Sequence, residues 1–569
     1  MEKRWSVKKH DFDRVSSLAN ELGVVPLVAA LLIDRGAEDP ESARKFLHPS
    51  HSDLHDPYLL RGMDRSVSRI KEAIERRERI LIWGDYDVDG TTGTALLRKA
   101  FRELGVETDF HIPDRFTEGY GLNIPALNEA ARRGCRLVIT VDCGTRSFEP
   151  IAWARANGLD VIITDHHLSD DEQSLPEAIA VINPKSVGCG YPDKELAGVG
   201  VALKLAQALL GERSDSERMN SFLEIAAIGT VADMMDLNGE NRAIVTLGLR
   251  QLNRTRNIGL RALMEVADCT AEMSSVHIGF RIAPRINAAG RMDIGSSVVE
   301  LLETKNIAEA RRIAASLDSR NRERQRMQAY ITERAFEEVL NYPNQEFMVV
   351  GGEGWHRGVI GLAASRLVEK FNRPAIVLSI ENGVAHGSAR GIRNFHVLDA
   401  LASCSDIFDQ FGGHAAAAGL KLKSSRIGEL RERLNSFAAT KLRGLDLLPV
   451  LDIDAVVTSE TLSLEMLKQI ACLEPFGIGN PKPVFLTSGL KVTREPLIMK
   501  ERHLKFSLAD RHGKYFEAVW WNGVERTSGR TFGHNSGIEV AYTADANEWQ
   551  GKRRLQLVIE DIRSAGETR

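Results

Sequence analysis

The sequence predicts an α/β protein: a parallel-sheet domain joined by a long helix to a second α/β domain, followed by an all-β barrel. From about residue 79, apolar runs alternate with amphipathic stretches, the pattern of a parallel sheet with crossover helices. Residues 306–340 lack Gly and Pro and carry an apolar stripe. After Leu448-Pro449, short alternating runs are separated by Gly, Asn and Asp. At 569 residues, the chain is long enough for several such domains.

The first α/β domain is predicted from three apolar runs with helices between them. Strands are expected at residues 79–83, 137–141 and 160–164. Helices are expected at residues 91–104, which begin with a Thr cap, and at 150–157. Residues 1–78 are harder to interpret, although 26–46 are expected to be helical. They are assigned to a helical segment packed on this domain.

The long helix and the two later domains follow from the same kind of pattern. Between residues 311 and 334 the helix holds seven Arg against three acidic residues. This favours a solvated face, with the wall of a nucleic-acid channel as the alternative. The second α/β domain is expected to begin with the apolar run at 347–350 and to end near residue 440. Barrel strands are expected at 504–508, 515–520 and 555–559.

Composition excludes several classes of protein. No apolar run approaches the roughly 20 residues of a membrane helix, and the N-terminus does not resemble a secretory signal, so we expect a cytoplasmic protein. Six cysteines without any C-x-x-C pair argue against a disulfide framework or a structural zinc site. The net charge of −4 gives no global attraction to nucleic acid, so any such binding depends on local basic surfaces.

Three carboxylates, Asp85, Asp87 and Asp89, lie just after the first predicted strand. Because they repel one another, such a cluster is tolerable when a divalent cation neutralises it, and oxygen ligands suit Mg²⁺ and Mn²⁺. The D-x-D-x-D-G pattern also matches the start of an EF-hand loop. That loop needs a Glu at position twelve and an entering helix, whereas this chain has Leu96 and a strand. The calcium-loop interpretation is therefore rejected.

Two further acidic sites repeat this placement. Asp142 directly follows the strand at 137–141, and Asp165, His166 and His167 directly follow the strand at 160–164. In an open α/β sheet, ligands bind outside the carboxyl ends of the strands, so these segments are expected to converge on one pocket. Adjacent histidines beside several carboxylates favour metal and phosphate chemistry there.

At these residues the chain resembles the DHH phosphoesterase superfamily, whose four ordered motifs are similar to DYDVDG, VDCGT, TDHHLSD and IGTVADMMDL. The resemblance implies two divalent cations, Mn²⁺ or Mg²⁺. It implies that His167, with Asp142 and Asp165, forms the catalytic set beside the scissile phosphate. Smaller members carry a metal-binding His where this chain has Trp83, and Asp85 is the expected replacement. The expected ligands are Asp85, Asp87, Asp89, Asp142, His166 and Asp233.

The second half carries motifs that indicate substrate binding. The run from Phe411 to Gly419 resembles the GGH motif of the DHHA1 domain, and its glycines allow a phosphate to approach a helix expected to begin near His414. A tight helix-packing seam is the alternative. Two segments, GWHRGVIG and PRINAAGR, resemble segments of RecJ exonucleases. The residues expected to bind substrate are Arg285, Arg291, His356, Ser388, Arg390, Arg393, Gly413 and His414.

The resemblance to RecJ exonucleases extends over nearly the whole chain. It assigns residues 1–78 to the N-terminal helical segment, 79–300 to the DHH domain, 301–342 to the connecting helix, 343–445 to DHHA1 and 446–569 to an OB-like barrel. It implies degradation of single-stranded DNA from the 5′ end to nucleoside 5′-monophosphates, in recombinational and mismatch repair. The expected partners are single-strand-binding protein and a DNA helicase. Base-stacking candidates on the barrel are Phe506, Phe516, Trp520 and Trp521, of which about half must face the core.

Two alternatives remain. A DHH hydrolase of short oligonucleotides or cyclic dinucleotides would have the same metal site, but such proteins are generally shorter and lack the added barrel. A non-catalytic scaffold that binds single-stranded DNA would keep the fold without the metal site. The retained carboxylates and histidines argue against it, because an idle carboxylate cluster would only destabilise the domain.

Overall fold

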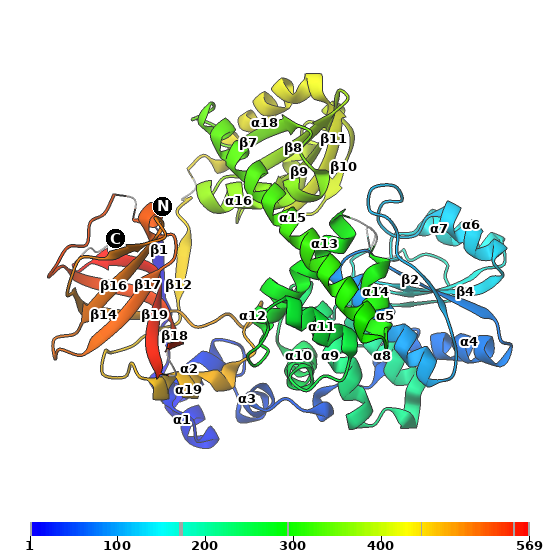
Figure 1. The fold of residues 1–569 in the computed structure, drawn as a ribbon, viewed down its shortest axis with the longest axis horizontal. Coiled ribbons are helices and arrows are strands. Elements are labelled where there is room, and N and C mark those ends of the chain that lie inside the picture. Colours follow the sequence, from blue (N-terminus) through cyan, green and yellow to red (C-terminus); the bar gives the residue numbers. More distant parts are fainter. Residues whose placement is uncertain are drawn as a thin grey trace. The chain divides into compact units, whose positions relative to one another are not determined.

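The computed structural model describes residues 3–169, 174–292, 295–444, 447–527, 529–549 and 552–566. The chain divides into two compact units, each described here by itself. One contains Trp5–Asp318 with Leu451–Arg569, and the other contains Ser319–Val450. The α/β class with a final barrel is the predicted one (Figure 1). The expected boundary between the DHHA1 domain and the barrel falls at residues 445 and 446, which lie outside the described part of the chain.

The first sheet is parallel throughout, as predicted. It has the order β3-β2-β4-β5-β6, so the chain leaves β2 first to one side and then returns to the other. Ligands bind where the strand order reverses in this way, here between β2 and β4. The strands are β2 Arg79–Gly84, β3 Asp109–His111, β4 Cys135–Val141, β5 Asp160–Thr164 and β6 Ala180–Ile182.

Helices cover both faces of this sheet because its strands are apolar on both sides. Ile80 and Ile82 face a large core formed with α5, α8, α9 and α10, whereas Leu81 and Trp83 face a smaller core with α6 and α7. The helices around this sheet are α4 Met63–Glu75, α5 Val88–Glu103, α6 Ile124–Arg132, α7 Phe148–Ala156, α8 Gly198–Leu210, α9 Ser216–Ala232, α10 Gly239–Leu252, α11 Ile258–Val266, α12 Ser275–His277, η4 Ile278–Ile282 (a π-helix), α13 Ala283–Met292 and α14 Ser296–Glu303.

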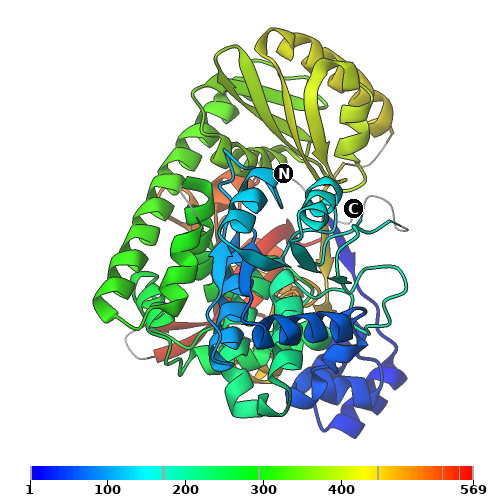
Figure 2. The same cartoon turned by 90° about the vertical axis from the view of Figure 1, so that its right-hand side faces the viewer.

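The long helix α15 spans Ile307–Leu340, close to the predicted 306–340 (Figure 2). It is separate from α14, which ends at Glu303. One face of α15 is buried and includes Leu317, Asp318 and Asn321. Five of the seven arginines between residues 311 and 334 are exposed, which fits a solvated face.

The second unit contains a mixed five-stranded sheet of order β10-β11-β9-β8-β7. The helix expected to begin near His414 is wrong: β10 and β11 form an antiparallel hairpin there, and the His414 N–H donates to the Ala417 carbonyl at 2.8 Å. Ladder hydrogen bonds to β10 and β9 on either side of β11 outweigh the helix propensity of the alanines. The elements are β7 Met348–Glu353, α16 Arg357–Phe371, β8 Ala375–Glu381, β9 Val384–Arg390, α17 Val397–Ala402, β10 Phe408–Gly413, β11 Ala417–Lys423 and α18 Ile427–Leu442.

The C-terminal barrel is a seven-stranded sheet of order β13-β14-β18-β19-β17-β16-β15, closed by pairing of β14 with β16. Phe506, Phe516 and Trp520 are buried in its core, whereas Trp521 is 49% exposed. The elements are β13 Ala455–Val456, α19 Leu464–Ile470, β14 Phe485–Val492, β15 Leu497–Met499, β16 His503–Ala509, β17 Tyr515–Trp520, α20 Gly523–Arg526, β18 Gly537–Trp549 and β19 Lys552–Ser564.

The N-terminal helices share their core with the barrel. Residues of α1 Phe12–Leu22, α2 Pro26–Ile33 and α3 Pro40–Leu47 pack with α19 and the barrel strands, whereas residues from Leu54 onward pack beside the parallel sheet. This differs from the expected packing of all of residues 1–78 on the DHH domain. The apolar side chains of the first three helices instead pack against barrel residues from 455 onward. The strand β1 Arg4–Val7 pairs with β12 Val450–Ile453.

Among the described residues, no single helix is both long and apolar enough to cross a bilayer. The pair α1 and α2, bent by 110° at their junction, passes the same test of length and composition when taken together.

Candidate metal centre

Acidic and histidine side chains converge at the carboxyl edge of the parallel sheet, where the loops after β2, β4 and β5 meet. Within the described residues three groups place their ligand atoms within 4.8 Å of one another. The groups are Asp85, Asp87 and Asp142; Asp89, His166 and Asp233; and Asp142, His166 and His167. The predicted convergence is therefore present, and Asp233 joins it from the end of α9.

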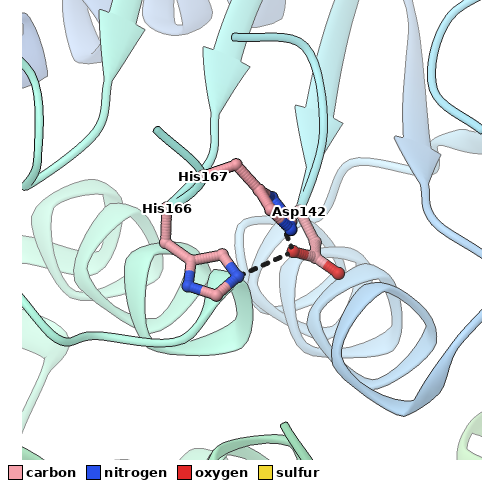
Figure 3. Close-up of side chains that lie close together, drawn as sticks. All are labelled: Asp142, His166 and His167. Atoms are coloured by element: carbon pink, nitrogen blue, oxygen red, sulfur yellow. Dashed lines mark ion pairs between the residues drawn. The ribbon is translucent and has the colours of Figure 1, made fainter. Parts of the chain in front are cut away.

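Asp142 belongs to two of these groups, and its carboxylate lies close to the rings of His166 and His167 (Figure 3). Its Oδ1 is 3.2 Å from Nε2 of His166 and 3.6 Å from Nδ1 of His167. The same His166 nitrogen is 3.4 Å from Oδ2 of Asp233. The backbone of Asp142 has φ of +62°, a left-handed conformation that Asp tolerates better than most residues. Its N–H donates to the Thr164 carbonyl at 3.0 Å, which ties β4 to β5 at this edge.

Asp89 is held by the N-terminus of α8. Its carboxylate accepts hydrogen bonds from the N–H groups of Gly198, at 2.6 Å, and Val199, at 2.8 Å. A Cβ at position 198 would lie 2.6 Å from the Asp142 Cβ, so only glycine allows this approach. The positive end of the helix dipole stabilises the anionic carboxylate. Asp87, two residues before Asp89, is the N-cap of α5, and its side chain accepts a hydrogen bond from the Gly90 N–H at 3.0 Å.

The clustering of buried carboxylates makes their ionisation unfavourable without a cation. Burial and the charge of Asp87 raise the pKa of Asp85 well above its usual value and that of Asp89 to about 7. Burial, with the charge of Asp89, raises the pKa of Asp142 strongly and that of Asp233 to about 9. A divalent cation at this position would favour all four carboxylates in the charged form.

Unpartnered polar atoms show that the residues fit such a cation. Among the described residues, five buried atoms of the cluster have no hydrogen-bond partner: Asp85 Oδ1, Asp142 Oδ1, Asp233 Oδ2 and both ring nitrogens of His166. Buried polar atoms are normally paired, so this concentration of orphans indicates a ligand. Burial lowers the pKa of His166 to about 3, which keeps its imidazole neutral, as a metal ligand must be. A donor set rich in carboxylates with one imidazole suits Mn²⁺ or Mg²⁺.

Trp83 stands where the resemblance described above implies a metal-binding His in smaller proteins. It is fully buried, and its ring packs on His111 with centroids 4.3 Å apart. The first group of ligand atoms is instead completed by the carboxylate of Asp85.

His167 and Asp165 form a hydrogen-bonded pair beside the cluster. Nδ1 of His167 lies 2.8 Å from Oδ1 of Asp165. Burial acts to raise the pKa of Asp165, but its hydrogen bonds and the charge of His167 outweigh burial and hold that pKa below the usual range. Burial acts to lower the pKa of His167, but the bond to Asp165 and the nearby carboxylate charges raise it overall. The pair therefore favours an imidazolium beside a carboxylate.

A cavity of about 330 Å³ opens beside the cluster and is lined by Asp85, Asp87, Asp142 and His167. It is also lined by Tyr86 and Asn287, which belong to the motifs DYDVDG and PRINAAGR, and by Arg115 and Tyr120, which the sequence did not single out. Tyr120 donates to the Asp142 carbonyl at 3.0 Å and lies 3.2 Å from His167 Nδ1. Arg115 and Tyr120 lie in the loop after β3. If this three-residue strand had been predicted, its loop would have been placed at the carboxyl edge of the parallel sheet, beside the cluster.

Comparison with known proteins identifies the family. Separate parts of the chain match the DHH family, N-terminal domain (residues 79–230), the DHHA1 domain (344–440) and the RecJ OB domain (453–561). The single-stranded-DNA-specific exonuclease RecJ of Bacillus subtilis (strain 168) is 42% identical over 563 residues, 98% of this chain and 70% of that protein. The chain belongs to the RecJ family.

Two crystal structures of RecJ from Thermus thermophilus are similar over almost the whole chain. The structure in complex with Mn²⁺ has a TM-score of 0.84 at 28% identity and covers 99% of this chain and 79% of that one. The structure in complex with Mg²⁺ has a TM-score of 0.76 at 27% identity, with coverage of 99% and 78%. The two cations in these RecJ structures are those that the donor set favours.

The two arginines of the RecJ-like segment PRINAAGR on α13 have different surroundings. Arg291 lines the cavity, and Gly290 beside it packs so closely that a Cβ would lie 2.2 Å from the Tyr86 carbonyl. Arg285 is not among the residues that line the cavity; its Nη2 pairs with Asp318 at 2.9 Å. The structure therefore brings Arg291 to the site and gives Arg285 another partner.

The remaining predicted substrate residues belong to the second unit. Arg390 on β9 donates to the Ser388 hydroxyl at 2.9 Å, and both side chains lie against Gly361 of α16. His356 caps α16 by accepting from the Gly358 N–H at 3.1 Å. The other three, Arg393, Gly413 and His414, are exposed, and Gly413 has φ of +151°.

Proposed function

We propose that this chain is a divalent-cation-dependent exonuclease that degrades single-stranded DNA from 5′ to 3′ and releases nucleoside 5′-monophosphates. One observation carries the proposal: unpartnered carboxylate and imidazole atoms converge at the sheet edge of a chain that is 42% identical to a single-stranded-DNA-specific exonuclease. Strand polarity follows the family resemblance.

In this proposal Asp85, Asp87, Asp89, Asp142, His166 and Asp233 would hold two cations, Mn²⁺ or Mg²⁺. Support comes from the converging ligand atoms, in which Asp142 and His166 each belong to two of the three groups. Bound cations of this kind activate water for attack on a phosphodiester and stabilise the charge of the transition state. The chain's own part is to fix these side chains rigidly, as α8 does for Asp89.

His167 would act as the proton donor next to the scissile phosphate. Asp165 accepts from its Nδ1, which fixes the ring and directs Nε2 to the reacting group. Asp165 itself is fixed by the Thr145 N–H at 2.9 Å and the His166 N–H at 2.7 Å. A protonated His167 is favoured by the raised pKa described above. Tyr120, which contacts both Asp142 and His167, would hold these two residues in a fixed relative position.

Phosphates of the DNA would be bound by Arg291 at the cavity and by the basic and glycine-rich residues of the second unit. We retain Arg285, His356, Ser388, Arg390, Arg393, Gly413 and His414 as proposed substrate residues, with Arg285 acting through its ion pair with Asp318 rather than by direct contact. Guanidinium groups and close backbone N–H groups are the usual phosphate ligands of proteins.

The proposed domain roles are catalysis by residues 79–300, substrate binding by 343–445, and guidance of the single strand by the barrel at 446–569. The ranges matched by the DHH, DHHA1 and RecJ OB family models support these roles. We further propose a cytoplasmic role in recombinational and mismatch repair, with single-strand-binding protein and a helicase as partners.

The test is digestion of a long single strand labelled at its 5′ or 3′ end, with Mn²⁺ or Mg²⁺. We expect early release of the 5′ label as a mononucleotide. Asp89→Ala and His166→Ala should abolish digestion and leave DNA binding nearly unchanged. Full activity in either variant would disprove the metal assignment, and early release of the 3′ label would disprove the polarity. Faster cleavage of dinucleotides than of long strands would favour a short-oligonucleotide hydrolase instead.

A further inference from the structure

Residues 473–481, which precede the main barrel strands, contact the loop that carries Asp233. This loop, residues 233–238, runs from the end of α9 to the start of α10. The Leu237 N–H donates to the Ile478 carbonyl at 2.8 Å, and the Asn238 side-chain amide donates to the Gly479 carbonyl at 3.3 Å. The second half of the loop is therefore held by the backbone of a segment more than 230 residues later.

The start of the segment is anchored to the helices around the metal centre. Arg242 on α10 is 2% exposed, and its Nη2 donates to the carbonyls of Leu473, at 3.0 Å, and Glu474, at 2.8 Å. The Ser275 hydroxyl donates to the Phe476 carbonyl at 2.5 Å. A buried guanidinium is costly unless its donors are satisfied, so these carbonyls are fixed in place as well as the arginine.

The segment also has an internal framework. Asn480 is fully buried, and its amide donates to the carbonyls of Leu473 and Pro475, each at 2.8 Å. The Gly477 N–H donates to the Asn480 carbonyl at 2.8 Å, which closes the turn that faces the loop. The turn is thus a rigid surface and not a flexible linker.

Contact between the turn and the loop is close enough to require glycine. Gly479 has φ of +72°, and a Cβ there would lie 2.7 Å from Nδ2 of Asn238 and 3.1 Å from Cγ of Asp236. At Gly477 a Cβ would lie 2.6 Å from Cδ1 of Leu237. A methyl group at either glycine must therefore displace the loop side chains that face it.

The position of Asp233 depends on this loop because its side chain has little else to hold it. Within the described residues its Oδ2 has no hydrogen-bond partner, although it lies 3.4 Å from His166 Nε2. Its backbone caps α9, with N–H donating to the Gly229 carbonyl at 2.8 Å, and Met234 then turns the chain with φ of +59°. The cap fixes one end of the loop, and the turn at 477–480 fixes the other.

We propose that residues 473–481 position Asp233 for cation binding, so that the segment leading into the barrel sets the cation affinity of the metal centre. These residues are positioning residues, since none of them is among the converging ligand atoms. The inference rests on the proposed function in taking Asp233 as a cation ligand.

The test compares two glycines with similar backbones. Gly479→Ala places a methyl group against the loop, whereas Gly489→Ala, at φ of +76°, meets nothing within 4 Å. Mn²⁺ alone is titrated into each full-length protein, and free Mn²⁺ is followed by electron paramagnetic resonance. We expect Gly479→Ala to bind Mn²⁺ about tenfold more weakly than the wild type, the usual effect of disturbing groups that orient metal ligands. Gly489→Ala should match the wild type, and binding of single-stranded DNA in chelator should be unchanged in both.

A second substitution separates positioning from general damage. Asn238→Ala combined with Gly479→Ala removes the nearest clash and should recover part of the lost affinity. If Gly479→Ala does not fold, Ser275→Ala removes one anchor of the segment, and we expect a smaller weakening in the same direction.

Wild-type Mn²⁺ affinity in folded Gly479→Ala, or equal weakening in Gly489→Ala, would overturn the proposal, as would wild-type affinity in Ser275→Ala. Failure of the wild type itself to bind Mn²⁺ would instead refute the proposed function on which this inference rests.

Discussion

The Nδ1 atom of His167 lies 2.8 Å from Oδ1 of Asp165, and the same carboxylate accepts hydrogen bonds from the backbone N–H groups of Thr145 and His166. Asp165 is therefore a fixed support for the histidine and is absent from the groups of converging ligand atoms. In the proposed mechanism, Asp165 would orient the proton donor His167, whereas other residues would hold the cations.

Replacing Asp165 by Asn tests that separation. The amide keeps the shape but loses the charge that raises the pKa of His167, so the alkaline limb of the pH–rate profile should move to lower pH. The turnover rate should fall by about 100-fold or more, as when a general acid is lost. Asp160→Asn, at the opposite end of β5, loses only an ion pair with Arg69 and serves as the control. An unshifted pH profile in Asp165→Asn would contradict the role.

Asp142→Asn should stabilise the cation-free protein and remove its response to Mg²⁺. The substitution removes a buried charge repelled by neighbouring carboxylates, and Asn tolerates the left-handed backbone. We expect a gain on the order of 1–2 kcal/mol in chelator at mild alkaline pH, measured by denaturant unfolding. Asp268→Asn, with φ of +53° and an exposed side chain, is the matched control and should change little. A loss of stability of Asp142→Asn in chelator would argue against repulsion between Asp142 and the neighbouring carboxylates.

Stabilisation by Mg²⁺ should increase with pH. Folding without a cation favours the protonated forms of Asp89 and Asp233, whose pKa values are raised to about 7 and about 9. These carboxyls therefore cost stability once the pH exceeds their unfolded pKa of roughly 4, and the cost grows by about 1.4 kcal/mol per pH unit for each group until its folded pKa is passed. A cation removes this cost. Thermal unfolding with and without Mg²⁺ at several pH values measures the difference, and a constant difference would contradict the prediction.

The neighbours Trp520 and Trp521 should respond differently to substitution by Ala. Trp520 is 1% exposed, so its loss should destabilise the protein by about 3–5 kcal/mol. Trp521 is 49% exposed and contacts His503, with ring centroids 4.8 Å apart. Its loss should weaken binding of oligo-dT by about 1–3 kcal/mol, the usual value of one stacked base, and leave the melting temperature nearly unchanged. Unchanged affinity for oligo-dT in Trp521→Ala would show that Trp521 is not part of the DNA-binding surface.

Arg285 and Arg291 on α13 offer a similar contrast. Arg285→Ala should lower stability by about 3 kcal/mol, because the side chains of Arg285 and Asp318 are only 15% and 9% exposed. Arg291→Ala should raise KM for single-stranded DNA more than Arg285→Ala does, because Arg291 lines the cavity. Steady-state kinetics and thermal unfolding of both variants separate the two roles. A raised KM in Arg285→Ala together with an unchanged KM in Arg291→Ala would contradict these roles.

The convergence of acidic and histidine side chains at the sheet edge was largely predictable from sequence, because most of them directly follow strands that are short, apolar and local in the chain. Asp142 and His166 were placed at one sheet edge by topology alone, and the structure sets them 3.2 Å apart. Arg115 and Tyr120 were missed because β3 is only three residues long and half-buried, which is too short for an alternating pattern to show.

Features that depend on distant partners were not predictable. The run after Gly413 has the composition of a helix, yet β9 and β10 recruit it into a sheet. Arg285 was expected to face substrate, but Asp318, on the next long helix, pairs with it. Alternation indicated that about half of the four candidate aromatics face the core, but only the closed barrel decides that Trp521 is the exposed one among Phe506, Phe516, Trp520 and Trp521.

The core shared by α1–α3 and the barrel also has a consequence for how the chain is made. These helices leave the ribosome long before their barrel partners, which begin at residue 455. At synthesis rates of roughly 5–20 residues per second, they wait about 20–80 seconds for a surface to pack on. The parallel sheet, contiguous from β2 to β6, can form in that interval. Helices α1–α3 can therefore complete their packing only after the parallel sheet has been made, and the apolar α2 should need protection in the nascent chain until the barrel residues follow.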